Sequence, residues 1–346
     1  MESSGHAGRV AINARAAVRA QIGGVERLAR EMVAHLPRLR PDRYRVIAPP
    51  ASLAHRAGHL WEQAMLPVQA AGCSLLYSPA NLAPVLWPRN AVVIHDVAAL
   101  RHPDAYSRSY VAYQRLLLPL LARHARLLIT VSEFSRGELA DVLGAAPERI
   151  VVVPDGVDER FGPQADAVSV AARYRLERPY VLTAGTMSAR KNLSVLGPAA
   201  RALRERGVDL VLAGSDRGYL RGSPVSVRRL GYVAEADLPG LYAGARALAM
   251  PSVYEGFGLP CLEAMACGIP VVAARSGALP ETIGDAGVLV DADDGDGFAA
   301  ALLAAACDER ARASLTEAGR RRAAGFSWSR TAALTDAAIS RVLGDR

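Results

Sequence analysis

Residues 254–270 have the sequence YEGFGLPCLEAMACGIP, the most informative stretch of the chain. Gly256 and Gly258 permit a tight loop, and Pro260 suits the first turn of a helix. Gly268 suits the end of that helix. The helix is therefore short, its first backbone N–H groups lack partners within it, and its positive dipole end can bind an anion. A helix start that meets only solvent explains the same pattern equally well.

Short β-like runs alternate with longer helical patterns on both sides of this stretch, which predicts parallel sheets covered by helices. We expect strands at residues 9–13, 44–48, 75–78, 91–95, 127–132, 150–153, 180–183, 210–213, 227–230, 247–250, 271–274 and 288–290. Helical patterns cover residues 25–35, 107–124, 298–306 and 330–343. The predicted fold class is α/β, with doubly wound sheets.

A polar, irregular stretch at residues 155–178 interrupts the alternation, and a chain of 346 residues is long enough for about two domains. We expect an N-terminal Rossmann-like domain at residues 1–175, a C-terminal one at residues 176–328, and a helical segment at residues 329–346. Doubly wound domains bind ligands outside the carboxyl ends of their strands, which predicts a ligand cleft between the two domains.

The chain has 41 basic and 34 acidic residues, a formal charge of +7. This excess suits nucleic acid, an anionic membrane surface or a phosphorylated substrate, but the arginines are dispersed, which favours a solvated basic surface. Aromatic and basic residues do not interleave, so we do not expect nucleic acid as a partner. Lys191 is the only lysine, kept either by chance or because a compact ammonium is needed there.

The four cysteines are Cys73, Cys261, Cys267 and Cys307, and none forms a C-x-x-C pair. We expect reduced, buried thiols in a cytoplasmic protein. Residues 1–9 are polar and lack the apolar core of a signal peptide. No stretch reaches the roughly 20 apolar residues that span a bilayer, so membrane contact is expected from one face at most.

Glu255 and Glu263, with seven residues between them in the frame E-G-F-G-L-P-x-x-E-A-M-A-x-G-x-P-V-V, resemble the signature of the retaining glycosyltransferases of family 4. These enzymes share a fold of two Rossmann-like domains called GT-B. Residues 185–192, Gly-Thr-Met-Ser-Ala-Arg-Lys-Asn, resemble the loop that binds the donor phosphates. Residues 230–233 resemble the stretch that lies against the nucleotide base, and residues 23–26 the glycine loop that faces the diphosphate. The resemblance covers nearly the whole chain.

The resemblance implies a role for each matching residue. Glu255 contacts the transferred sugar, Glu263 accepts hydrogen bonds from the ribose hydroxyls, and Arg190 with Lys191 stabilises the charge on the leaving diphosphate. His95 lies near the donor sugar without acting as general base; without the resemblance, a core or capping histidine is the better interpretation. The other residues expected at the donor are Gly23, Gly24, Gly185, Tyr232, Val233, Gly256, Phe257, Gly258 and Leu259. By the same analogy residues 330–343 pack back on the first domain.

Two features depart from the family pattern. Asp155 stands where the family more often has Asn, and we expect a structural role in a turn there. Residues 13–21, before the glycine loop, give no signature for the acceptor.

The predicted function is the transfer of a hexose from a nucleotide-diphosphate sugar to a glycan, lipid or small-molecule hydroxyl, with GDP-mannose as the favoured donor. No cofactor and no metal are expected, because the helix after Gly258, with Arg190 and Lys191, already supplies the positive charge that a metal would bring. We interpret residues 291–296 as an acidic turn in which Asp294 or Asp296 caps the next helix. Four alternatives stay open: an epimerase or a phosphorylase of the same fold, a glycosidase using the paired carboxylates, and a non-catalytic nucleotide or nucleic-acid binding protein.

Overall fold

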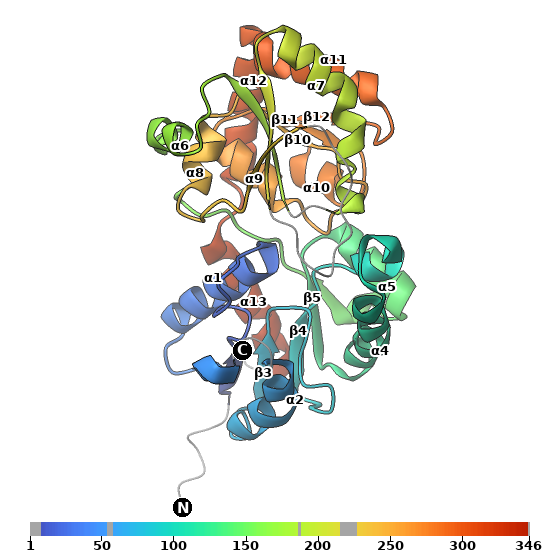
Figure 1. The fold of residues 1–346 in the computed structure, drawn as a ribbon. Helices are drawn as coiled ribbons and strands as arrows, with labels where there is room; N and C mark the ends of the chain where they lie inside the picture. The colour runs from blue at the N-terminus through green and yellow to red at the C-terminus, as the bar shows by residue number, and fades with distance from the viewer. Residues whose placement is uncertain (1–7, 54–57, 186–187, 215–226, 345–346) are drawn as a thin grey trace, which may run out of the picture. The chain divides into compact units, whose positions relative to one another are not determined.

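The computed structural model describes residues 8–53, 58–185, 188–214 and 227–344. Clustering of contacts divides the chain into two compact units, each a parallel sheet covered by helices (Figure 1). Unit 1 comprises residues 1–100, 112–156 and 328–346, and unit 2 comprises residues 101–111 and 157–327. The chain therefore passes between the units more than once.

The sheet of unit 1 has six parallel strands in the order β2-β1-β3-β4-β5-β6. The strands are β1 (Val10–Asn13), β2 (Tyr44–Ile47), β3 (Leu75–Ser78), β4 (Asn90–Val93), β5 (Leu127–Thr130) and β6 (Ile150–Val152). The helices are α1 (Gly24–Leu39), α2 (Gly58–Gln69), α3 (Ala98–Arg101), α4 (Arg108–His124), α5 (Glu133–Leu143) and α13 (Trp328–Leu343). The strand order reverses between β1 and β3, which makes this the switch point where doubly wound sheets bind ligands.

Helix α13 completes unit 1, although it follows the whole of unit 2 in the sequence. It packs against α1. The Tyr44 hydroxyl donates a hydrogen bond of 2.6 Å to Asp336 Oδ1, and Arg40 Nε lies 2.9 Å from Asp336 Oδ2. The Thr331 hydroxyl donates to the carbonyl of Pro154. These polar contacts hold the amphipathic helix in one register on the unit.

The sheet of unit 2 also has six parallel strands, in the order β12-β11-β10-β7-β8-β9. The strands are β7 (Tyr180–Ala184), β8 (Asp209–Ala213), β9 (Arg228–Gly231), β10 (Ala247–Met250), β11 (Val271–Ala274) and β12 (Val288–Val290). The helices are α6 (Ala167–Arg173), α7 (Gly197–Glu205), α8 (Leu238–Ala243), α9 (Leu259–Ala266), α10 (Leu279–Ile283), α11 (Gly295–Cys307) and α12 (Glu309–Ala323). The switch point lies between β7 and β10.

The α/β class and all twelve predicted strands are confirmed, with ends that shift by one or two residues. The division of the chain differs from the expected boundary at residue 175. Residues 157–175 belong to unit 2 because α6 packs on α8, and residues 101–111 belong there too. In that segment the His102 ring lies edge-on to Tyr254, with ring centroids 5.2 Å apart.

The cysteine prediction needs one correction. Cys73, Cys261 and Cys267 are free and buried, but Cys307 is exposed because it ends α11 at the surface. Within the described part of the chain, no helix combines the length and the apolar character that crossing a membrane requires. Residues 1–7, which the prediction about a signal peptide concerns, lie outside the described residues.

Candidate active site

The loop that enters α9 adopts the geometry predicted from its glycines and prolines. Gly258 precedes the helix in a left-handed conformation, with φ of 100°, and Pro260 stands in the first turn. Gly268 follows the helix with φ of 77°. A Cβ at Gly258 would also lie 2.8 Å from Leu279 Cδ2. The predicted short helix is therefore confirmed, and its start follows the carboxyl end of β10 at the switch point of unit 2.

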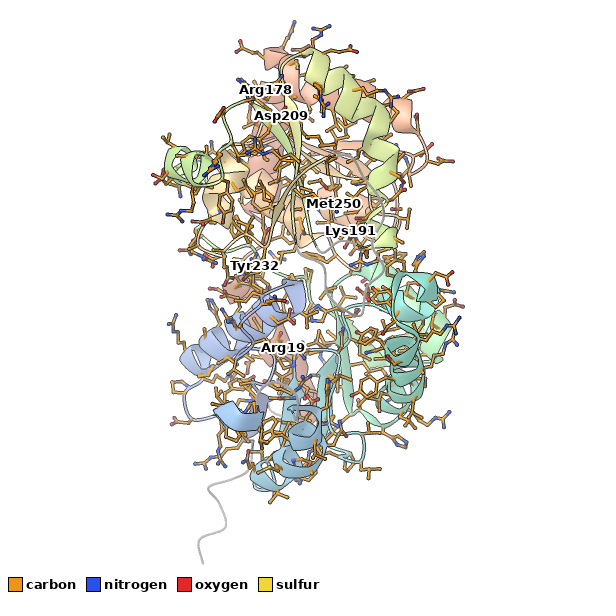
Figure 2. The ribbon with its side chains drawn as sticks, viewed as in Figure 1. Arg19, Arg178, Lys191, Asp209, Tyr232 and Met250 are labelled. Atoms are coloured by element: carbon orange, nitrogen blue, oxygen red, sulfur yellow. The ribbon has the colours of Figure 1, made fainter. Side chains whose placement is uncertain are left out.

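Arg190, Lys191 and Glu255 form a buried ion cluster at this switch point. Arg190 and Lys191 lie in a 3₁₀ turn at residues 189–191, after β7. Glu255 Oε1 is 2.7 Å from Lys191 Nζ and 3.0 Å from Arg190 Nη1. Arg190 Nη1 also donates to the carbonyl of Tyr254 at 2.6 Å. The side chains of Arg190, Lys191 and Glu255 are 18%, 10% and 10% exposed, so little solvent screens their charges. Figure 2 labels Lys191 and Met250 at this end of unit 2.

The cluster keeps Glu255 ionised. Burial raises the pKa of Glu255, but Arg190, Lys191 and hydrogen bonds from Lys191 and Ser252 outweigh it and hold the pKa at about 2. Burial lowers the pKa of Lys191, and the neighbouring Glu255 carboxylate opposes that shift. Among these three side chains, two cations face a single carboxylate.

Two glycines make room for this cluster. A Cβ at Gly185 would lie 3.0 Å from Lys191 Nζ, and a Cβ at Gly277 would lie 2.7 Å from the backbone nitrogen and oxygen of Glu255. Both glycines have positive φ, 131° and 58°. The Glu255 carbonyl accepts a hydrogen bond from Ala278 N at 2.9 Å. The position of the Glu255 backbone is thus set by close packing.

The remaining donor residues predicted in unit 2 lie on the same segments. Gly256 and Phe257 continue the loop from Glu255, and Leu259 begins α9. Glu263 is buried in the second turn of α9. Tyr232, labelled in Figure 2, follows β9 and is 45% exposed, whereas Val233 is buried. Thr186 and Met187 of the predicted phosphate loop lie outside the described residues.

Gly23, Gly24 and His95 belong to unit 1. Gly23 caps α1, its N–H donates to Glu26 Oε2 at 3.0 Å, and Gly24 is the first helical residue. His95 is buried, with Nε2 3.1 Å from the carbonyl of Pro79, and its own carbonyl accepts a hydrogen bond from the Ser135 hydroxyl. Gly24 has open space at its Cβ position, unlike Gly185 and Gly277.

Asp155, for which we expected a structural role in a turn, is a buried carboxyl near His95 and Arg27. Its side chain is buried, and its Oδ1 has no hydrogen-bond partner among the described residues. Burial raises the pKa of Asp155 to about 6, while His95 and Arg27 act in the opposite direction. The residue is therefore a poorly compensated carboxyl beside the predicted histidine.

The prediction about the acidic turn is confirmed at one residue. Asp294 caps α11 by accepting a hydrogen bond from Gly297 N. No group of three or more His, Cys, Asp or Glu side chains suited to a metal ion occurs among the residues that the structure describes.

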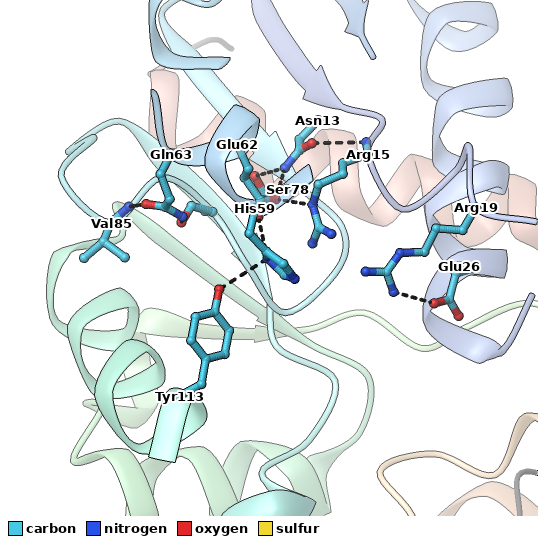
Figure 3. A network of polar contacts seen from close by, with 11 residues as sticks. Asn13, Arg15, Arg19, Glu26, His59, Glu62, Gln63, Ser78, Val85 and Tyr113 are labelled. Atoms are coloured by element: carbon cyan, nitrogen blue, oxygen red, sulfur yellow. Dashed lines mark hydrogen bonds and ion pairs between the residues drawn. The ribbon is translucent and has the colours of Figure 1, made fainter. Parts of the chain in front are cut away.

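Sequence reasoning missed a polar cluster at the switch point of unit 1 (Figure 3). Asn13 Nδ2 donates to Glu62 Oε1 at 2.6 Å, and Arg15 Nε lies 3.1 Å from the same oxygen. All three side chains are buried. The available signal was position: Asn13 ends a fully buried strand, and Arg15 follows two residues later.

Two family models match the chain: Glycosyltransferase Family 4 over residues 74–161, and Glycosyl transferases group 1 over residues 178–308. O-antigen chain mannosyltransferase B of Escherichia coli is 35% identical over 272 residues, which cover 73% of this chain and 71% of that protein. D-inositol 3-phosphate glycosyltransferase of Salinispora arenicola is 39% identical over 233 residues, 59% of this chain and 52% of that protein.

Solved structures agree on the architecture. Sucrose-phosphate synthase from Thermosynechococcus elongatus superposes with a TM-score of 0.75 at 20% identity, covering 97% of this chain and 99% of that one. Anabaena HepE, solved with UDP and glucose, gives a TM-score of 0.72 at 20% identity, covering 96% of this chain and 99% of the other. These likenesses show the same fold, and the predicted GT-B class is confirmed.

Proposed function

Because the chain belongs to glycosyltransferase family 4, we propose that it transfers a hexose from a nucleotide-diphosphate sugar to a hydroxyl acceptor, with retention of configuration and without a metal ion. Glycosyltransferase activity follows from the family. The donor, the stereochemistry and the metal independence are the parts that we add.

The buried ion cluster is the observation that carries this proposal. Arg190 and Lys191 face the Glu255 carboxylate near the start of α9, where the helix dipole is also positive. A leaving nucleoside diphosphate gains negative charge as the sugar–phosphate bond breaks. Preorganised cations in a site with little water stabilise that charge more in the transition state than in the ground state.

Glu255 does not suit the role of the protonated general acid of a glycosidase. A glycosidase needs one carboxyl that holds a proton near neutral pH. The pKa of Glu255 is held at about 2, so this group is a carboxylate that accepts hydrogen bonds and donates none. We therefore assign Glu255 to the hydroxyls of the donor sugar. In the retaining reaction, a phosphate oxygen of the donor takes the proton of the acceptor hydroxyl.

The proposal needs no divalent metal, because Arg190, Lys191 and α9 already provide positive charge where a metal would act. Turnover in excess EDTA should equal turnover with magnesium or manganese. Strict metal dependence, restored by adding the ion back, would refute this part of the proposal.

GDP-mannose is the proposed donor because several relatives are named as mannosyltransferases, among them the Escherichia coli protein. A thermal-shift panel of GDP, UDP, dTDP and ADP sugars identifies the base and the sugar. NMR of the product then gives the anomeric configuration. An epimerised nucleotide sugar in place of a glycoside would establish the epimerase alternative. A cytoplasmic location stays a prediction.

A further inference from the structure

The loop between β1 and α1 in unit 1 carries Arg15 and Arg19, and backbone hydrogen bonds fix its conformation. Ala17 N donates to the carbonyl of Ala14, and Arg19 N to that of Ala16, which makes consecutive tight turns. From α1, Arg30 donates to the carbonyls of Ala17 and Arg19, at 2.9 and 2.8 Å. Arg15 and Arg19 are therefore carried by a preorganised loop outside the carboxyl end of β1.

Arg15 is buried but has unused donors. Its side chain is 4% exposed, and its Nε faces Glu62 Oε1 at 3.1 Å. The two Nη groups have no hydrogen-bond or ion-pair partner among the described residues. Gly58, at the start of α2, packs against the aliphatic part of Arg15. A Cβ added at Gly58 would lie 3.4 Å from Arg15 Cδ. Because only Nε of this guanidinium faces a carboxylate, its two coplanar Nη groups stay available to bind two oxygens of one acidic group.

His59, Tyr113 and Arg19 surround the same space (Figure 3). The Tyr113 hydroxyl and His59 Nδ1 are 3.3 Å apart. Arg19 is 39% exposed and pairs with Glu26 at 3.1 Å. Burial first, and then the positive charges of Arg15 and Arg19, lower the pKa of His59 to about 4. His59 Nδ1 also lies 3.9 Å from Glu62 Oε2, so one buried carboxylate and two guanidinium groups face this imidazole.

We propose that Arg15, Arg19, His59 and Tyr113 bind an acidic group, a phosphate or a carboxylate, on the acceptor. The Arg15 side chain is only 4% exposed, so water has little access to its Nη donors, which favours an occupant with several acceptor oxygens. The cluster lies at the switch point of the unit 1 sheet, where open α/β sheets bind ligands. The donor diphosphate already has its cations in unit 2. Anion binding stands without the proposed function, whereas its assignment to the acceptor rests on it.

The first experiment follows the ring signal of His59 by NMR at pH 7, assigned with His59→Gln, while sodium sulfate replaces chloride at constant ionic strength. Saturable movement of this signal, with the other six histidines as internal controls, is the expected result. A sulfate ion bound next to the ring should also raise the measured pKa of His59 by about one unit, because a negative charge favours the protonated imidazole. Mannose 6-phosphate should act like sulfate, and mannose should not.

Variants separate a built site from general charge. Arg19→Gln should weaken sulfate binding roughly tenfold to a hundredfold, since hydrogen bonds to charged groups contribute that much. Arg178→Gln is the matched control: Arg178 is 47% exposed, also pairs with a carboxylate (Asp209), and lies where β7 begins. Arg15→Gln with Glu62→Gln, which keeps the buried pair neutral, should abolish binding.

Three outcomes would overturn the proposal: no saturable shift, an equal shift with mannose, or an equal loss in Arg178→Gln. If GDP alone reproduces the His59 shift and Arg19→Gln weakens GDP binding, the site belongs to the donor diphosphate and the assignment to the acceptor is wrong. A failure of the proposed function gives a different result: the protein neither binds nor turns over nucleotide sugars, while the His59 signal still responds to sulfate.

Discussion

Unit 1 and unit 2 each place an arginine and a buried glutamate at the switch point of a six-stranded sheet, but they balance the charges differently. In unit 2, one oxygen of Glu255 faces both Arg190 and Lys191. In unit 1, Glu62 faces Nε of Arg15, the amide of Asn13 and, at 3.9 Å, Nδ1 of His59. In the first cluster two cations face one carboxylate, whereas in the second the Nη donors of Arg15 have no partner among the described residues. Similar residues at equivalent places in two similar sheets can therefore serve different ligands.

Removing one cation from the cluster in unit 2 should have the largest effect. We expect Lys191→Gln to reduce kcat roughly a hundredfold to a thousandfold, the usual cost of losing one preorganised donor to a developing oxyanion. Glu255 would keep Arg190 as its partner, so the fold should persist at lower stability. Steady-state turnover of the donor and thermal unfolding measure the two effects.

The double variant Lys191→Gln with Glu255→Gln sharpens this test. It should recover stability, because no buried carboxylate loses a partner, but it should not recover turnover. Arg178→Gln serves again as the control that leaves turnover unchanged. Wild-type turnover in folded Lys191→Gln would break the comparison, since the cluster would then be structural only.

Asp155 in unit 1 is a buried carboxyl whose pKa is raised, whereas the pKa of Glu255 in unit 2 is lowered. Its folded pKa of about 6 lies above the ordinary 3.8, so its contribution to stability is present below pH 3.8 and is lost as the pH rises through 6. Asp155→Asn removes that loss and should stabilise the protein at pH 8 by up to about 3 kcal/mol. Urea unfolding at pH 8 and at pH 4 checks it: the gain should shrink at the lower pH, and equal stabilities at pH 8 would contradict the assignment.

Substitutions of the two motif glutamates, Glu255 and Glu263, should affect different parts of the donor. Glu263→Gln should weaken binding of the bare nucleoside diphosphate by about 1.5–3 kcal/mol, if its carboxylate bonds the ribose. Glu255→Gln should spare that binding and reduce sugar transfer. Calorimetry with GDP and UDP decides; equal losses of affinity in the two variants would remove the division of roles.

Glycine substitutions give the smallest expected effect and compare the two units directly. Gly277→Ala places a Cβ 2.7 Å from the Glu255 backbone at a φ of 58°, and we expect a loss of roughly 1–3 kcal/mol. Gly24→Ala meets open space in α1 and should lose no stability, because alanine is the better helix former. Denaturant midpoints measure both, and a tolerant Gly277 would mean that the Glu255 loop can move.

Much of the fold was predictable because the strands are short and the inner ones are mostly apolar and buried along their length. The edge strands β2 and β9 are partly exposed. The start of α9 was predictable for a local reason: Gly258, Pro260 and Gly268 specify their own backbone. The pairing of Arg15 with Glu62 was not, because the two are far apart in sequence and meet only once β1 and α2 have packed. The burial of Asp155 and the placement of residues 101–111 in unit 2 also depend on tertiary contacts that no local pattern encodes.

The position of α13 has a consequence for synthesis on the ribosome. Unit 1 takes its first strand from residues 10–13 and its closing helix from Trp328–Leu343, so the whole of unit 2 is translated in between. A domain that depends on such distant contacts must form its long-range pairings late. While residues 157–327 are being made, the face of α1 that receives α13 has no covering helix, and Tyr44 lacks its Asp336 partner. Until residues 328–343 emerge, the nascent chain therefore carries an incomplete unit 1 whose uncovered helix face is open to aggregation.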